Sequence, residues 1–247
     1  MMLDLLNLEV LSTVMIISGF QKLTLVDYPG HTACIIFTQG CNFRCPFCHN
    51  SGLIQGGNNS NKIDEQVLFD YLDKRKGLID GVCISGGEPL LQKDIEMFTK
   101  KIKEKGYKVK LDTNGSKPKL LKDLIDKKLI DYVAMDIKNT FSKYDLTAGG
   151  VKVDINDIQE SISVLKNSNI DFEFRTTVVK ELHDLENISE ILEFIGSDVK
   201  FYIQNYRDCD TVLKKGLNGF SDEELLNIQK NLERKYPNVI IRGRGKR

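Results

Sequence analysis

The strongest constraint on this chain is a short loop that carries three cysteines. The segment Gly40-Cys41-Asn42-Phe43-Arg44-Cys45-Pro46-Phe47-Cys48 spaces Cys41, Cys45 and Cys48 as C-x3-C-x2-C. Thiolates bind iron–sulfur clusters, and three of them leave one iron of a [4Fe–4S] cluster open to another ligand. A structural zinc site usually takes four ligands in two close pairs, and the chain has no second C-x2-C pair. The spacing therefore favours a cluster with one open iron.

Two other interpretations of this loop remain. The cysteines could be structural and buried, or His49 could complete a zinc site. The loop is polar, begins with glycine and follows an apolar strand, which suits a ligand site better than a core. Six cysteines in 247 residues, three of them clustered, do not resemble a secreted disulfide framework, so we expect a reducing, cytoplasmic compartment. Cys34, Cys83 and Cys209 are expected to be buried or incidental thiols.

Charge and chain length narrow the class of protein further. Lys plus Arg and Asp plus Glu both number 35, so we expect neither nucleic acid nor a membrane as a partner. Residues 1–14 are too short for a membrane span and lack the basic region of a signal peptide. We expect an N-terminal extension or start-site ambiguity over 1–14 and one domain over 15–247. The basic end, Arg242, Arg244, Lys246 and Arg247, is expected to be a solvated tail.

Apolar strand-like segments alternate with amphipathic helical ones. After a hairpin pattern over 16–28, the expected core strands are 32–38, 81–85, 107–111, 131–137, 171–179 and 199–204. One helix begins at Asp64, and the others cover 92–105, 119–128, 154–167, 185–195 and 221–235, the last with a Ser221/Glu224 capping box. This alternation predicts a parallel α/β sheet with right-handed connections. Six units are fewer than the eight of a closed barrel, so we expect an open partial (β/α)6 TIM-like barrel.

Polar residues lie at or just after the carboxyl ends of three of the expected strands. They are Gly86-Gly87-Glu88-Pro89, Asp112-Thr113-Asn114-Gly115 and Asp136-Ile137-Lys138. Carboxyl ends of parallel strands meet at one edge, where active sites lie, although each segment could also be a turn or a helix cap. The two glycines allow a ligand close to the backbone, and a carboxylate at Glu88 suits a cationic amine.

The strand over 171–179 has polar residues on one face. Alternation places Glu173, Arg175 and Thr177 together, facing the barrel interior, where Glu173 and Arg175 could form an ion pair. Among the histidines, His31 and His183 are expected to be surface or capping residues.

The cysteine loop, with Phe47 before its last cysteine, resembles the cluster-binding loop of the radical S-adenosylmethionine (radical SAM) superfamily. Gly86 to Pro89, some forty residues later, matches a second motif of that superfamily. The resemblance implies that Cys41, Cys45 and Cys48 bind one [4Fe–4S] cluster, whose open iron chelates the amino and carboxylate groups of SAM. One electron then cleaves SAM to methionine and a 5'-deoxyadenosyl radical.

The whole pattern is similar to the glycyl-radical enzyme activating enzymes, among them activators of anaerobic ribonucleoside-triphosphate reductase and of pyruvate formate-lyase. The similarity is carried by 19–30, 37–50, 86–89, 112–115 and 136–138. It implies an oxidoreductase of the EC 1.97.1 type that abstracts hydrogen from a glycine of a partner enzyme. It also implies an electron donor of the flavodoxin or ferredoxin type. Cys48 and Gly86 are too close for an insert carrying further clusters.

The same resemblance assigns the cofactor contacts. The residues implied to bind SAM are Phe47, Gly86, Gly87, Glu88, Asp112, Thr113, Asn114, Asp136 and Lys138. Glu88 and the glycines would face the amino group. The aspartates would gather around the carboxylate with a monovalent cation between them, which would relieve their repulsion.

Two other functions stay open. The chain could be a radical SAM enzyme for a small molecule, such as a nucleoside precursor. It could also be a metal-binding or electron-transfer module without chemistry of its own, in which case Gly86 to Pro89 would have no role.

Overall fold

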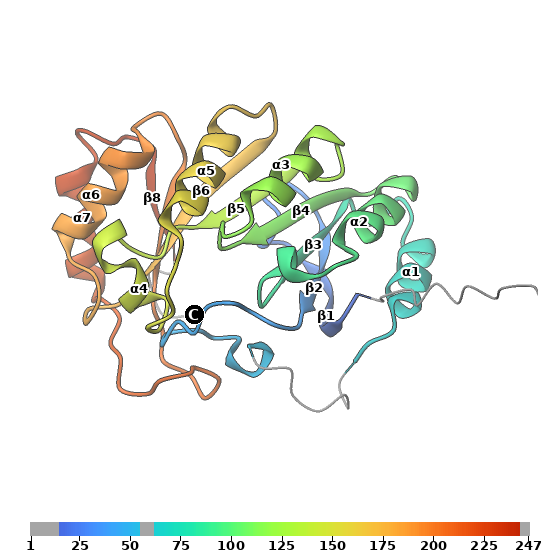
Figure 1. Cartoon of the computed structure of the whole chain (residues 1–247), viewed down its shortest axis with the longest axis horizontal. Coiled ribbons are helices and arrows are strands. Elements are labelled where there is room, and N and C mark those ends of the chain that lie inside the picture. The colour runs from blue at the N-terminus through green and yellow to red at the C-terminus, as the bar shows by residue number, and fades with distance from the viewer. Residues whose placement is uncertain (1–14, 55–61, 243–247) are drawn as a thin grey trace, which may run out of the picture.

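An eight-stranded curved sheet forms the centre of the protein in the computed structural model, which describes residues 15–54 and 62–242 (Figure 1). The strands lie in the sheet in chain order. β1 runs antiparallel to β2, and every later pair is parallel. The strands are β1 (Ile17–Thr24), β2 (Ala33–Thr38), β3 (Gly81–Gly86), β4 (Lys108–Thr113), β5 (Tyr132–Asp136), β6 (Asp171–Val178), β7 (Phe201–Asn205) and β8 (Val239–Arg242).

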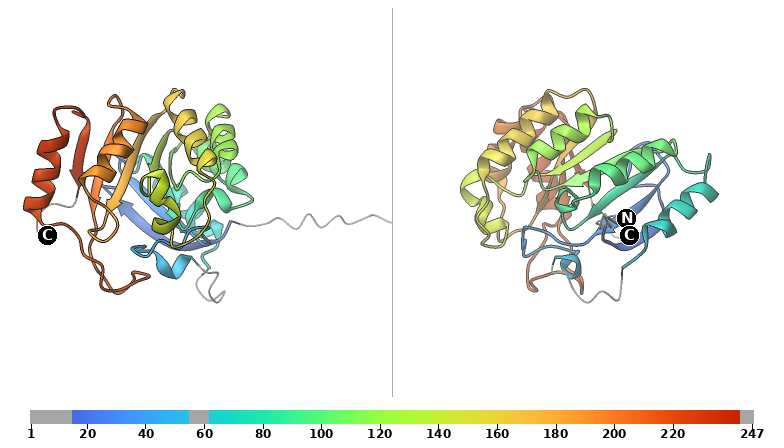
Figure 2. Two further views of the ribbon diagram at one scale, coloured as in Figure 1. Left: turned by 60° about the vertical axis from the view of Figure 1, so that its left-hand side comes forward. Right: turned by 45° about the vertical axis from the view of Figure 1, so that its right-hand side comes forward.

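Helices cover the outer face of the sheet, and the inner face lines the barrel (Figure 2). The α-helices are α1 (Glu65–Lys74), α2 (Ile95–Glu104), α3 (Pro118–Asp126), α4 (Tyr144–Thr147), α5 (Ile155–Lys166), α6 (Leu185–Ile195) and α7 (Asp222–Leu232), and short 3-10 turns are η1 (Ser51–Leu53), η3 (Pro89–Leu91) and η4 (Phe141–Lys143). Apolar residues at helical spacing, such as Ile95, Phe98 and Ile102 of α2, are buried against the strands. None of the helices in the described ranges is long and apolar enough to cross a membrane.

Side-chain caps determine where several helices begin. Asp64, Asp154 and Asp184 each accept a hydrogen bond from a backbone N–H in the first turn of the helix that follows. The capping box expected at α7 is confirmed, since Ser221 and Glu224 each bond the backbone N–H of the other. These caps satisfy backbone donors that would otherwise lack a partner in the first turn of each helix.

The open partial barrel expected from the sequence is confirmed, with β1 and β8 at the two edges of the sheet. All six expected core strands are present, and β8 adds a seventh parallel strand beside β7. β8 was not predicted because its Val-Ile-Ile-Arg segment is short and leads straight into the basic end of the chain.

The interpretation of Arg242 as part of a solvated tail is wrong. Arg242 is the last residue of β8, and its Nη1 lies 2.8 Å from Glu173 Oε1. Its guanidinium also lies 3.4 Å from the centre of the Tyr202 ring. Glu173 is almost completely buried, so this pairing offsets the cost of burying its charge. The rest of the basic end (Arg244, Lys246 and Arg247) and residues 1–14 lie outside the described residues.

Candidate active site

A cavity of about 440 Å³ lies at the carboxyl ends of the parallel strands, within the size range of small-molecule sites. Its lining includes Cys41, Cys45, Phe47, Cys48, Gly86, Gly87, Asp112, Thr113, Asn114, Asp136 and Lys138, which are all the residues proposed for the site except Glu88. They come from the cysteine loop and from the carboxyl ends of β3, β4 and β5 with the residues that follow, which are far apart in the sequence. The fold therefore brings the three motifs and the cysteine loop to one place.

The cysteine loop is held to the barrel on several sides. Gly40 N donates to Leu53 O at 2.7 Å, and Arg44 N donates to Ala148 O at 2.8 Å. A β-carbon on Gly149 would lie 2.0 Å from Arg44 O, so only glycine allows this contact between the α4 turn and the loop. On the outer side, Lys214 N donates to Pro46 O at 2.8 Å. These backbone contacts hold the cysteine loop against the rest of the protein.

Polar side chains link the cysteine loop to the segment that follows β4. Asn114 Nδ2 donates to Asn42 Oδ1, and Asn42 Nδ2 donates to Ser116 Oγ, both at 2.9 Å. Ser161 of α5 supports this segment by donating to Gly115 O at 2.6 Å. Asn114 therefore positions the loop, in addition to lining the cavity.

The three thiols have raised pKa values, chiefly because they are buried. Burial raises the pKa of Cys45 to about 11, although the positive charge of Lys138 acts against it. Burial also raises the pKa of Cys41 and of Cys48. These thiols keep their protons at neutral pH, so loading with iron must release protons and stabilise the thiolates.

The arrangement of these thiols fits a cluster. Among the described residues, no three Cys, His, Asp or Glu side chains converge as ligands of a single ion would. A [4Fe–4S] cluster does not need such convergence, because each thiolate binds a different iron. Cys41, Cys45 and Cys48 all line the cavity. Lys138 is close enough for its positive charge to offset part of the rise that burial causes in the pKa of each thiol.

Glu88 lies behind the cavity wall, and its carboxylate does not face the ligand space as the sequence analysis expected. The residue is 1% exposed. Its Oε1 accepts from Thr113 Oγ1 at 2.8 Å and Leu90 N at 3.1 Å, and its Oε2 accepts from Asn114 N at 2.7 Å. Burial raises the pKa of Glu88 to about 7 despite these bonds. The carboxylate therefore joins the loop after β3 to the loop after β4.

Replacing Glu88 with glutamine is expected to lower the free energy of unfolding by about 1–3 kcal/mol. One carboxylate oxygen would become an NH2 group, which cannot accept the hydrogen bonds that Thr113 Oγ1, Leu90 N and Asn114 N donate to the carboxylate. Urea unfolding of Glu88→Gln and the parent protein measures this difference. Glu104→Gln is the matched control, since Glu104 is exposed at the end of α2. A Glu88→Gln protein as stable as the control would show that the carboxylate does not hold the two loops together.

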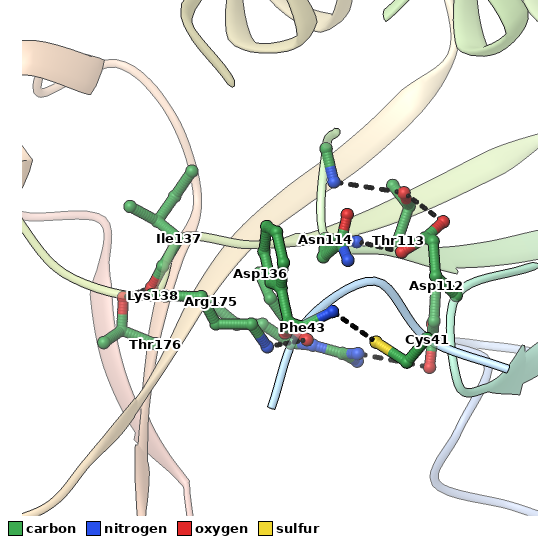
Figure 3. A network of polar contacts seen from close by, with 12 residues as sticks. Cys41, Phe43, Asp112, Thr113, Asn114, Asp136, Ile137, Lys138, Arg175 and Thr176 are labelled. Atoms are coloured by element: carbon green, nitrogen blue, oxygen red, sulfur yellow. Dashed lines mark hydrogen bonds and ion pairs between the residues drawn. The ribbon is translucent and has the colours of Figure 1, made fainter. Parts of the chain in front are cut away.

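Arg175 connects the two aspartates of the cavity (Figure 3). Its Nη2 lies 3.2 Å from Asp112 Oδ2, and its Nε donates to Asp136 Oδ1. Burial alone would raise the pKa of both carboxyls, but Arg175 and the neighbouring lysines outweigh it and lower both pKa values. The expected ion pair between Glu173 and Arg175 is wrong. Glu173 instead binds Arg242 and accepts from Tyr132 OH.

His183 was expected to be a surface or capping residue; it is buried, so the surface alternative is wrong, and its ring bonds backbone groups as a capping residue does. Its Nδ1 accepts from Val179 N at 3.1 Å, and its Nε2 lies 2.8 Å from Lys138 O. These contacts define a tautomer with the proton on Nε2, and burial lowers the pKa of the ring. His183 also packs edge-to-face against Phe47, so it supports both Lys138 and the cysteine loop.

Sequence reasoning missed three polar residues of the barrel interior. Lys110 is 2% exposed and donates to Asp112 Oδ1, and the signal for it was a lysine between Val109 and Leu111 in an apolar strand. Thr177 was placed on the inner face, but neither it nor Gln204 was proposed for the site. The two lie opposite each other on β6 and β7 and line the cavity.

An open barrel with a three-cysteine loop after its first parallel strand defines the class. The model of the Radical SAM superfamily matches residues 35–195, and the chain belongs to this superfamily, in its group of glycyl-radical enzyme activating enzymes. The group is shown by a protein of Methanocaldococcus jannaschii assigned as a glycyl-radical enzyme activating enzyme. It is 35% identical over 234 residues, covering 92% of this chain and 95% of the relative. The cofactors of this superfamily are a [4Fe–4S] cluster and SAM.

One further relative agrees with this assignment, and one solved structure agrees with the fold. The pyruvate formate-lyase-activating enzyme of Listeria monocytogenes is 36% identical over 133 residues, covering 49% of this chain and 52% of that enzyme. A crystal structure of a domain of pyruvate-formate lyase-activating enzyme from Bacteroides vulgatus superposes with a TM-score of 0.53 at 18% identity. It covers 66% of this chain and 99% of that domain, and it supports the fold.

Proposed function

We propose that this protein activates a glycyl-radical enzyme by removing a hydrogen atom from a glycine of that partner. The observation that carries the proposal is that the three cysteines and the carboxyl ends of β3, β4 and β5 line the same cavity. When bound there, the cluster and SAM supply a 5'-deoxyadenosyl radical, the chemistry of an oxidoreductase of the EC 1.97.1 type. The protein's part is to bind, orient and shield these groups.

The residues divide this work. Cys41, Cys45 and Cys48 hold the cluster, and the backbone at Gly86 and Gly87 offers the amino group of SAM a close approach. Glu88 contributes by fixing that backbone to Thr113 and Asn114. The remaining contacts proposed for SAM are Phe47 beside the cluster and, near the carboxylate, Asp112, Asp136 and Lys138.

The substrate is a glycine-bearing segment of the partner enzyme. The barrel is open between β1 and β8, so a chain segment has a side from which to enter. Anaerobic ribonucleoside-triphosphate reductase is the first partner to test, and the relative from Listeria makes pyruvate formate-lyase the second. We place the protein in the cytoplasm as one domain over 15–247, with a flavodoxin or ferredoxin type protein as electron donor.

Anaerobic reconstitution followed by electron paramagnetic resonance tests this function. The reduced protein should give a [4Fe–4S]+ signal that changes shape with SAM. Adding the partner should then produce a glycyl radical on the partner together with 5'-deoxyadenosine. A cluster signal that SAM does not change would favour the alternative of a metal-binding or electron-transfer module. SAM cleavage that only a small molecule stimulates would favour the nucleoside-type enzyme.

Thr177 and Gln204 are expected to hold the partner's glycine segment. Both are half-buried and line the cavity, and neither side chain has a hydrogen-bond partner among the described residues, so the side-chain polar groups are free for a peptide backbone. The Thr177→Val, Gln204→Met double variant should form the glycyl radical about 10- to 100-fold more slowly, at about 0.5–1.5 kcal/mol for each lost hydrogen bond. SAM binding should not change.

Rates of glycyl-radical formation at several partner concentrations measure this effect, with SAM affinity measured in parallel. Gln66→Met is the matched control, because Gln66 is exposed on α1. Equal rates for the double variant and the control would show that the partner segment lies elsewhere in the cavity.

A further inference from the structure

The carboxylates of Asp112 and Asp136 face each other across the ends of β4 and β5, where family resemblance implies a monovalent cation. The structure places a guanidinium there instead (Figure 3). Arg175 Nη2 lies 3.2 Å from Asp112 Oδ2, and Arg175 Nε donates to Asp136 Oδ1. Arg175 reaches this position from the inner face of β6.

The other two carboxylate oxygens are also bound to cations. Lys110 Nζ donates to Asp112 Oδ1, and Lys138 Nζ donates to Asp136 Oδ2 at 3.0 Å. Ser85 Oγ adds a bond to Asp112 Oδ2 at 2.9 Å. Each of the four carboxylate oxygens is therefore already hydrogen-bonded or ion-paired to a charged side chain.

The balance of charge points the same way. The cluster formed by Lys110, Asp112, Asp136, Lys138 and Arg175 holds two negative and three positive side chains, and all five are buried or partly buried. A further cation would meet three like charges at short range, where water screens little. A ligand with a carboxylate would instead neutralise the surplus charge. The residues present do not fit a monovalent cation, and they do fit an anionic group.

We propose that Arg175, together with Lys110 and Lys138, replaces the monovalent cation at this site, so that SAM binds without K⁺ or Na⁺. This inference rests on the SAM site of the proposed function. Lys110 supplies the third positive charge, which makes the net charge of this cluster positive. Its ammonium group contacts Asp112 and lies 5.9 Å from the centre of the Tyr132 ring, inside the barrel. Arg175 and Lys110 act as positioning residues that hold the two aspartates, and together with Lys138, a proposed SAM contact, they present a net positive charge.

The first test uses the reconstituted wild-type protein. SAM affinity is measured by calorimetry in KCl, NaCl and choline chloride at equal ionic strength. We expect dissociation constants that agree within about twofold, whereas a required cation would tighten binding by about tenfold or more. Binding that needs K⁺ or Na⁺ would overturn this inference alone. Failure to bind SAM in all three salts would overturn the proposed function and this inference with it.

A variant tests the part assigned to Lys110. Lys110→Met removes one positive charge and frees Asp112 Oδ1, so SAM binding should become weaker in choline chloride and recover in KCl, by about tenfold. Lys108→Met is the matched control, because Lys108 lies on the same strand but is exposed. If Lys110→Met stayed as indifferent to K⁺ as the control, the role given to Lys110 would be wrong. The wild-type measurement decides the inference even if Lys110→Met does not fold.

Discussion

Replacing Cys45 with alanine is expected to abolish cluster binding and, with it, the cleavage of SAM. Cys45 is the most buried of the three thiols in the cavity, and no other described cysteine lines that cavity to take its place. Loss of outer-shell partners alone weakens metal sites by about 10- to 100-fold, so loss of a ligand should exceed about 100-fold. Iron and sulfide content after anaerobic reconstitution, and 5'-deoxyadenosine formed under reducing conditions, measure both effects.

Cys209→Ala is the matched control for Cys45→Ala. Cys209 is exposed, and its thiol contacts Thr211 outside the cavity. This variant should load iron and cleave SAM as the wild type does. We expect both variants to keep the fold, because the side chain lost from Cys45 is small. Circular dichroism of both variants before reconstitution checks this. A Cys45→Ala protein that still binds a complete cluster and cleaves SAM would contradict the assignment of the three ligands.

The sequence predicted the fold well because its signals are local and repeated. Apolar strands alternate with helices whose starts are capped, as at Ser221, and parallel strands then leave few ways to connect. The cavity was predictable for the same reason: residues at carboxyl ends of neighbouring parallel strands must meet at one edge. The positions of Asp112 and Asp136 follow from this rule and from the register of β4 with β5.

The partners of charged residues could not be predicted in this way. Alternation placed Glu173 and Arg175 on one face, but which charge each one meets depends on β8 and on neighbouring strands. Arg242 supplies the partner of Glu173 from the far end of the chain. Glu88 illustrates the same limit, since a short loop can direct its carboxylate into the cavity or behind it. Long-range pairing therefore set the electrostatics of the site.

Replacing Gly87 with alanine is expected to separate the loop after β3 from the cysteine loop. A β-carbon on Gly87 would lie 2.0 Å from the carbonyl oxygen of Gly40, which is backbone and cannot rotate away. The same two loops share the hydrogen bond from Glu88 N to Gly40 O at 2.8 Å, so relieving the clash would break it. Overpacking of this kind costs about 1–3 kcal/mol.

Because the cysteine loop and the Gly86–Gly87 backbone both line the cavity, this cost should appear in ligand binding. We expect SAM to bind Gly87→Ala about 10- to 100-fold more weakly. Calorimetric titration of the reconstituted variant measures the change. Gly52→Ala is the matched control, since a β-carbon there meets nothing within 4 Å although Gly52 follows the same cysteine loop. Unchanged affinity in Gly87→Ala would mean that SAM does not depend on the close contact between these loops.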